Sequence, residues 1–171
     1  MEWNYYFERI NKNTIQRYDI TPLFENPEVF SNLIEDMLKS FKNTDFDKIV
    51  GIDALGFILA GALALKTKKP LIVARKEGKL PSKPENVLKV KFTDYTETEK
   101  AFEMNKGAIE KGDKVLIVDE WIETGGQVKA AIELVERQGG EVVGITTLGA
   151  EKNHKTKVLF DKYRCRPIQV L

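Results

Sequence analysis

One stretch of about 35 residues constrains the fold more than any other, because it contains a strand, a turn, a helix and a second strand in succession. Residues 115–118 form a continuous β-rich run, typical of a strand buried on both faces. After a turn, apolar side chains recur at helical spacing over residues 127–138, and Gly139 and Gly140 end that helix. Residues 141–148 supply the next strand. Such a unit predicts an α/β fold with a parallel sheet.

The remainder of the chain continues the alternation. Hydrophobic period and Pro or Gly punctuation predict an amphipathic helix over residues 27–41 and a nearly all-apolar, buried helix over 57–66. Strands are predicted at 48–52, 71–74 and 87–92, with an exposed loop over 75–86 and a short helix near 101–110. No repeat or second domain is visible, so we expect a single domain spanning residues 1–171.

Composition excludes several classes of protein. The 27 basic and 26 acidic side chains leave a net charge of +1, which argues against nucleic acid or an anionic membrane as a partner. The longest apolar run, residues 54–65, is much shorter than the roughly 20 residues needed to span a bilayer. Cys165 and His154 are the sole residues of their types, so neither a disulfide nor a zinc site is expected. Together with an N-terminus that lacks a signal peptide's apolar region, this predicts a cytoplasmic protein.

A ligand site is expected over residues 119–127, because ligands bind open parallel sheets beyond the carboxyl ends of the strands. Asp119 and Glu120 can accept hydrogen bonds from ribose hydroxyls or from water on Mg²⁺. Thr124, Gly125 and Gly126 can turn successive backbone N–H groups toward a phosphate at the start of the next helix. The alternative is a plain strand-to-helix turn with solvated acids. The GxxxxGK[ST] and GxGxxG motifs are both absent, which argues against P-loop and dinucleotide enzymes.

These residues carry a specific resemblance. VLIVDEWIETGGQ is similar to the 5-phosphoribosyl-1-pyrophosphate (PRPP) signature of the type I phosphoribosyltransferases. Three further stretches resemble the adenine-specific branch: DITPLFENPEVF from Asp19, GIDALGF from Gly51 and RKEGKLP from Arg75. The similarity runs in order from about residue 14 to residue 149. It implies a central, mostly parallel sheet flanked by helices, with a small hood formed by about residues 1–40.

The resemblance implies roles for particular residues. Asp119 and Glu120 would hold the ribose hydroxyls of PRPP, and its 5′-phosphate would lie in the loop formed by Glu123, Thr124, Gly125, Gly126 and Gln127. The pyrophosphate would be bound by the loop containing Asp53 and Ala54 and by the cations Arg75, Lys76 and Lys79. Solvated lysines in an exposed loop are the alternative for those three. Lys79 would also assist catalysis by neutralising the leaving group. Asp94 stands where the family has a catalytic loop acid, in a loop that is two residues longer here. Arg17 and Tyr18 would contact the base.

The chain departs from the family pattern at chemically important positions. Leu55 replaces an arginine of the pyrophosphate loop, removing a permanent cation. Glu123 replaces a small residue and Gln127 a threonine beside the expected 5′-phosphate. Two like charges 4 Å apart cost about 1 kcal/mol in water, so Glu123 must point away from the phosphate or PRPP must bind weakly. Arg17 and Tyr18 stand in place of Phe-Arg, whose phenylalanine stacks on adenine.

Two functions remain open at this point. The first is an enzyme that transfers the phosphoribosyl group of PRPP to a purine, most plausibly adenine, giving AMP and pyrophosphate. It would act with Mg²⁺ bound together with PRPP, with no metal ligand supplied directly by the protein, and as a homodimer. A phosphoribosyltransferase for another base is a variant of this reading. The second is a re-purposed regulatory module that binds PRPP or a nucleoside monophosphate without catalysis. The tail, residues 158–171, is expected to add a strand or to cover the base site.

Overall fold

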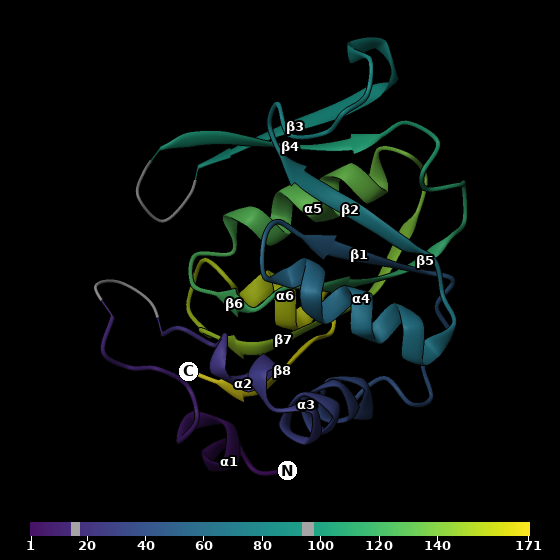
Figure 1. Cartoon of the computed structure of the whole chain (residues 1–171). Coiled ribbons are helices and arrows are strands. Elements are labelled where there is room, and N and C mark those ends of the chain that lie inside the picture. The colour runs from purple at the N-terminus through teal and green to yellow at the C-terminus, as the bar shows by residue number, and fades with distance from the viewer. Residues whose placement is uncertain (15–17, 94–97) are drawn as a thin grey trace.

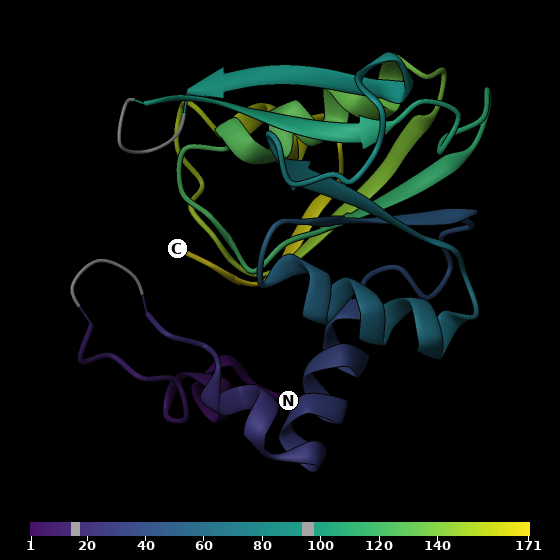
Figure 2. The ribbon, with the colours of Figure 1, turned by 45° about the horizontal axis from the view of Figure 1, so that its top comes forward.

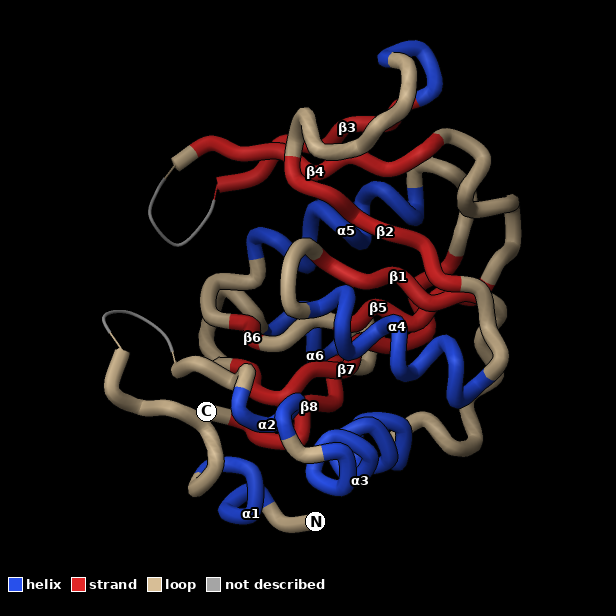
Figure 3. The backbone as a smooth tube through the Cα atoms, viewed as in Figure 1, coloured by secondary structure: helices blue, strands red, loops and turns tan. Residues whose placement is uncertain are grey.

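The computed structural model describes residues 1–14, 18–93 and 98–171, and their elements are shown in Figures 1 and 3. The helices are α1 (Trp3–Phe7), α2 (Pro22–Glu25), α3 (Pro27–Lys39), α4 (Gly56–Thr67), α5 (Gly126–Glu136), α6 (Lys157–Asp161) and the 3₁₀ turn η1 (Pro84–Asn86). The strands are β1 (Lys48–Ile52), β2 (Leu71–Lys76), β3 (Val87–Thr93), β4 (Glu99–Asn105), β5 (Lys114–Val118), β6 (Trp121–Ile122), β7 (Glu141–Ala150) and β8 (Cys165–Val170).

The described strands form one sheet in the order β3-β4-β2-β1-β5-β7-β6, with β8 also paired to β7. Strands β2, β1, β5 and β7 run parallel to one another, and β6 and β8 run parallel to β7. Strands β3 and β4 pair antiparallel, and β4 pairs antiparallel with β2. The predicted fold, α/β with a central, mostly parallel sheet flanked by helices, is therefore confirmed.

Alternation along the central strands divides the core into two layers. Ile49 and Leu116 belong to a cluster with the N-terminal helices, α3 and α4, whereas Val50 and Val115 belong to a cluster with α5 and β4. Successive side chains of a strand point to opposite faces, so one short apolar run supplies both layers. This is why the two strands read as continuous hydrophobic segments rather than as alternating ones.

The hood lies on the α4 side of the sheet, where Figure 2 shows the N-terminal helices below α4. Fully buried Tyr6 and Leu23 of this segment pack in the same cluster as Leu59 of α4 and Leu148 of β7. Helix α3 begins where the side chain of Asn26 accepts hydrogen bonds from two backbone N–H groups of its first turn. The N-terminal segment is thereby fixed near the carboxyl ends of β6 and β7.

One predicted element is wrong. The segment near residues 101–110, expected as a short helix, contains β4, which runs over Glu99–Asn105. Its residues Ala101, Phe102, Glu103 and Met104 are all buried. Pairing with β3 and β2 leaves this stretch covered on both sides, so tertiary contacts override its helical propensity. The predicted exposed loop is also shorter than expected, because β2 continues to Lys76.

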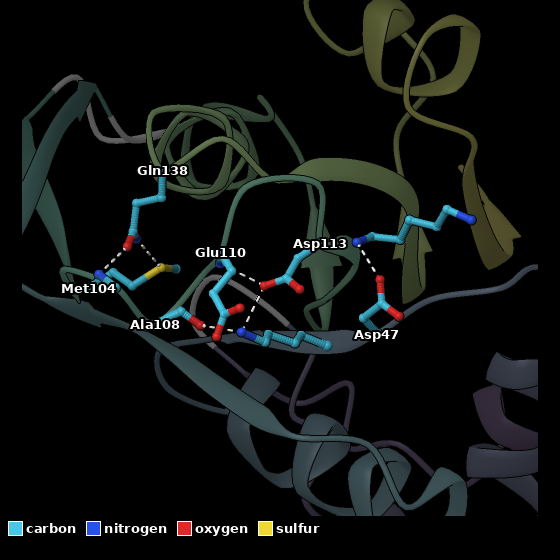
Figure 4. A network of polar contacts seen from close by, with 9 residues as sticks. Asp47, Met104, Ala108, Glu110, Asp113 and Gln138 are labelled. Atoms are coloured by element: carbon cyan, nitrogen blue, oxygen red, sulfur yellow. Dashed lines mark hydrogen bonds and ion pairs between the residues drawn. The ribbon is translucent and has the colours of Figure 1, made fainter.

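Polar contacts link the amino end of β5 to the amino end of β1 (Figure 4). Nζ of Lys48 lies 2.7 Å from Oδ2 of Asp113 and donates to the carbonyl of Ala108 at 3.1 Å. The Lys114 amide donates to Asp47 at 2.9 Å. These contacts close the end of the sheet opposite the predicted site. Within the described residues, no helix is long and apolar enough to cross a membrane.

Candidate functional site

The predicted acidic pair lies where β5 ends. Asp119 is 2% exposed, and its Oδ1 accepts the backbone N–H of Glu120 at 2.9 Å. Oε2 of Glu120 is buried and has no hydrogen-bond partner among the described residues. A buried carboxylate oxygen without a partner is costly, so it is a position at which a ligand hydroxyl or an ordered water is expected. This donor-seeking group suits a ribose hydroxyl.

The start of α4 packs directly against this pair. A Cβ at Gly56 would lie 3.0 Å from the carbonyl oxygen of Val118 and 3.2 Å from Oδ1 of Asp119. Glycine therefore permits the loop containing Asp53 and Ala54 to lie beside the acids. The structure thus brings together two segments that are more than sixty residues apart in the sequence, as the order of the parallel strands requires.

The predicted phosphate loop forms the start of α5. Gly125 adopts φ 77° and precedes the first residue of this 11-residue helix, so a side chain there would be strained. A Cβ at Gly126 would lie only 2.4 Å from the carbonyl oxygen of Thr93, at the end of β3. Thr124 and Gln127 flank the pair and are half-buried. The unpaired N–H groups of a helix start bind anions, which matches the predicted chemistry of this loop.

Two of the predicted pyrophosphate-binding cations, Arg75 and Lys76, lie beside the carboxylate of Asp53, a contact that the sequence did not predict. Oδ2 of Asp53 lies 3.5 Å from Nε of Arg75, and its Oδ1 lies 3.8 Å from Nζ of Lys76. The Lys76 amide also approaches Oδ2 of Asp53 at 3.4 Å. The two cations are therefore partly neutralised by a neighbouring carboxylate. Lys79 lies in the exposed turn that follows β2, where its amide donates to the carbonyl of Lys76 at 3.1 Å.

A cavity of about 280 Å³ lies between the hood and the edge of the sheet. Tyr18 of the hood packs edge-on against Trp121 of β6 at this cavity, with ring centroids 6.3 Å apart and an interplanar angle of 62°. Its lining residues are Lys12, Thr14, Tyr18, Trp121, Ile122, Glu123, Glu151 and Leu171. Tyr18 and Glu123 were predicted, so the structure places a predicted base contact and a predicted phosphate-loop residue in one cavity.

Sequence reasoning missed several residues of this cavity. Trp121 packs on Trp3, with ring centroids 6.1 Å apart, and also lines the cavity. Glu151 follows β7, and its position could have been found from the rule that strand ends meet at one edge. Lys12 and Thr14 carried no signal, because the hood's contacts depend on tertiary folding. Arg17 and Asp94, both predicted, lie outside the described residues.

No cluster of three or more His, Cys, Asp or Glu side chains suited to a metal occurs in the part of the chain that the structure describes. The donor set at the strand ends, Asp119 and Glu120, consists of carboxylate oxygens, which suit the coordinated waters of Mg²⁺. A magnesium ion brought in by a polyphosphate would therefore fit this edge through water, without direct protein ligands.

Residues 20–170 match the phosphoribosyl transferase domain family, a span that contains the two acids, the glycine loop and Lys79 but leaves out Lys12, Thr14, Tyr18 and Leu171 of the cavity. The chain belongs to this family. Two curated phosphoribosyltransferases are similar over the same region. Adenine phosphoribosyltransferase of Petrotoga mobilis is 44% identical over 130 residues, covering 76% of this chain and 73% of the relative. That of Halothermothrix orenii is 45% identical over 127 residues, covering 74% and 72%.

Solved structures of phosphoribosyltransferases share the whole fold. Adenine phosphoribosyltransferase of Thermoanaerobacter pseudethanolicus superimposes with a TM-score of 0.88 at 27% identity, covering 99% of both chains. The Rhodothermus marinus enzyme gives 0.83 at 34% identity, covering 99% of this chain and 98% of the other. The Giardia lamblia enzyme, complexed with 9-deazaadenine, gives 0.87 at 26% identity, covering 100% and 98%.

Proposed function

We propose that this protein transfers the 5-phosphoribosyl group of PRPP to N9 of adenine, forming AMP and pyrophosphate in purine salvage. One observation carries the proposal. In a chain about 44–45% identical to enzymes named adenine phosphoribosyltransferase, the acid pair and the anion-binding loop lie side by side at one sheet edge. The bond from C1′ to the pyrophosphate oxygen breaks, the bond from C1′ to N9 forms, and the N9 proton leaves.

The two acids and the glycine loop would bind the sugar phosphate. Asp119 and Glu120 accept hydrogen bonds from the ribose hydroxyls. Oε2 of Glu120, which has no hydrogen-bond partner among the described residues, gains a donor when PRPP binds. The N–H groups around Gly125 and Gly126 bind the 5′-phosphate at the positive end of α5. Glu123 lines the hood cavity. Gln127 adds a neutral donor to the same loop.

The leaving group would be bound by the loop at Asp53 and Ala54 together with Arg75, Lys76 and Lys79. Catalysis of this kind passes through an oxocarbenium-like sugar, so its main requirement is to stabilise charge that develops on pyrophosphate. Lys79, which forms no ion pair with the described residues, would supply a further cation. Mg²⁺ bound with PRPP would supply further positive charge at the pyrophosphate.

The base would lie in the hood cavity beside Tyr18 and Trp121, whose rings line it and offer apolar surface to a purine. Arg17 would contact the same base, and Asp94 would accept the N9 proton. We further propose that the whole chain acts as one domain with the first 40 or so residues as its hood. By family analogy it would work in the cytoplasm as a homodimer.

A second function is favoured by one observation. Leu55, which replaces the family's arginine, is half-buried and packs against the hood-side core cluster. A regulatory module that binds PRPP or a nucleotide without turnover would tolerate this loss of cationic charge. The two functions share ligand binding and differ in product formation.

Isothermal titration tests the binding site on which both functions depend. PRPP is expected to bind more tightly when Mg²⁺ is present, and Asp119→Asn is expected to weaken binding by about 1.5 to 3 kcal/mol through loss of charge-assisted hydrogen bonds. Asp45→Asn is the matched control, because Asp45 is an exposed acid paired with Lys114 at the amino end of the sheet. A protein that binds neither PRPP nor AMP would overturn the proposal.

A further inference from the structure

Glu103 of β4 is a buried acid to which the proposed reaction assigns no role. Its side chain is 9% exposed, whereas that of Glu99 on the same strand is 68% exposed. Placing a carboxylate in a protein interior is unfavourable unless hydrogen bonds and opposite charge compensate for the lost hydration. The partners of Glu103 therefore indicate what the buried carboxylate does.

Those partners belong to the basic turn, which we define as residues 76–79, between β2 and the loop that leads to β3. Oε2 of Glu103 accepts the backbone N–H of Gly78 at 2.9 Å. Oε1 lies 3.7 Å from Nζ of Lys89, which in turn donates to Oε1 of Glu77 at 2.6 Å. Both oxygens of one carboxylate thus serve the turn, one directly and one through a shared lysine.

The register of the sheet explains why this acid can reach the turn. Glu103 lies opposite Arg75 in the antiparallel pair of β2 and β4, so it flanks the last residues of β2 before the turn begins. The Glu77 amide donates to the carbonyl of Ala101 at 3.0 Å, which extends the attachment by one more residue. Because β4 is the strand that sequence analysis expected as a helix, this attachment was not foreseeable from pattern.

Gly78 lies at the exposed tip of the turn. Gly78 has φ 73°, and a Cβ at this position would meet no atom within 4 Å, so the turn projects into open space. Without a hydrogen bond to hold it, the backbone at a glycine can also adopt many other conformations. A hydrogen bond donated by this one N–H to a buried, charged acceptor is a direct way to select the conformation seen.

We propose that Glu103 is a positioning residue that holds the basic turn so that Lys79 meets the pyrophosphate of PRPP. This inference rests on the proposed function, because it assumes that Lys79 binds the leaving group. Without the Glu103 carboxylate, the turn is free to adopt other conformations. Binding of PRPP must then also order the turn and Lys79, which lowers the affinity. AMP carries no pyrophosphate, so its affinity does not depend on the turn.

Titration of three single variants with PRPP and Mg²⁺, and separately with AMP, tests the proposal. Glu103→Ala is expected to weaken PRPP binding by about tenfold or more while AMP binding changes by less than about twofold. Glu103→Gln keeps an acceptor oxygen of the same reach and is expected to retain most of the PRPP affinity. Glu99→Ala removes an exposed acid from the same strand and is the matched control, expected to bind both ligands like the wild type.

A double-mutant cycle identifies the residue through which Glu103 acts. In a Lys79→Ala background, Glu103→Ala is expected to cause little further loss of PRPP affinity, because the turn no longer carries the cation. Equal losses for PRPP and AMP, an undiminished loss in the Lys79→Ala background, or a Gln variant as impaired as the Ala variant would each overturn the positioning role. A wild type that binds neither ligand would instead overturn the proposed function, which keeps the two failures distinct.

Discussion

A Cβ on residue 149 would lie 1.9 Å from the six-membered ring of Trp121, so glycine at this position of β7 is what allows the indole to lie against the strand. The contact is formed across the parallel pair of β6 and β7, in which Trp121 is the register partner of Gly149. The indole that it positions lines the hood cavity beside Tyr18. The width of the proposed base site therefore depends on the absence of a methyl group.

Gly149→Ala is expected to displace Trp121 and to cost about 1 to 3 kcal/mol of unfolding free energy, the usual range for overpacking. Adenine or AMP affinity should fall as well, because the displaced ring enters the cavity. Urea unfolding and AMP titration measure the two effects. Trp121→Leu in the Gly149→Ala background should recover part of the stability, and a double variant no more stable than the single one would show that the clash is relieved elsewhere.

Leu55→Arg restores the cation that the family carries in the pyrophosphate loop. An arginine can make a bidentate, charge-assisted contact to pyrophosphate, so PRPP turnover is expected to rise about tenfold for each 1.4 kcal/mol of transition-state stabilisation gained. Steady-state rates and PRPP titration on the one variant separate an enzyme from a module that binds without turnover. If a folded variant shows unchanged binding and rate, residue 55 does not face the pyrophosphate.

Asp113 should give the fold an acid-sensitive contact. Partial burial raises its pKa, but the hydrogen bonds from Nζ of Lys48 and from the Glu110 amide lower it more, so the pKa lies below its ordinary value. A carboxyl whose folded pKa is lowered stabilises the fold above its unfolded pKa of about 3.9, and this contribution is lost as the pH falls through the folded pKa.

Asp113→Asn is accordingly expected to cost about 1 to 2 kcal/mol of unfolding free energy at pH 7 and much less near pH 3. Urea titrations of the wild type and the variant at both pH values measure the difference. An equal cost at the two pH values would contradict a charge-dependent contact between Asp113 and Lys48.

Cys165, the single cysteine of the chain, should be unreactive in the folded protein. It is fully buried at the start of β8, and burial raises the pKa of its thiol to about 12. The thiolate is the reactive form, so a thiol reagent at pH 8 should label the protein only as it unfolds. Fast labelling without denaturant would mean that β8 separates readily from β7.

The parallel part of the fold could be predicted from the sequence because its signals are local. The apolar runs of β1 and β5 and the glycine pair after α5 each specify one element without reference to the others. The carboxyl-end rule then places Asp119 and the phosphate loop at one edge. The predicted strand over 48–52 agrees with β1, and the predicted site segment over 119–127 surrounds the start of α5.

The remainder could not be predicted because it depends on long-range pairing. The β4 segment is a strand since β2 and β3 cover it, and Glu103 is buried for the same reason. The pairing of Asp53 with Arg75 depends on how two neighbouring strands end. The hood cavity joins Lys12 to Glu151, residues separated by most of the chain, and no local pattern encodes that contact.

Phosphoribosyl transfer to adenine is tested by an assay of product formation. Adenine, guanine, hypoxanthine and xanthine would each be incubated with PRPP, Mg²⁺ and the purified protein, with nucleotide and pyrophosphate measured together. The account predicts equal amounts of AMP and pyrophosphate from adenine, at a rate that Asp119→Asn lowers by about tenfold to a hundredfold. A wild-type protein that binds PRPP but forms no nucleotide from any of the four bases would contradict it.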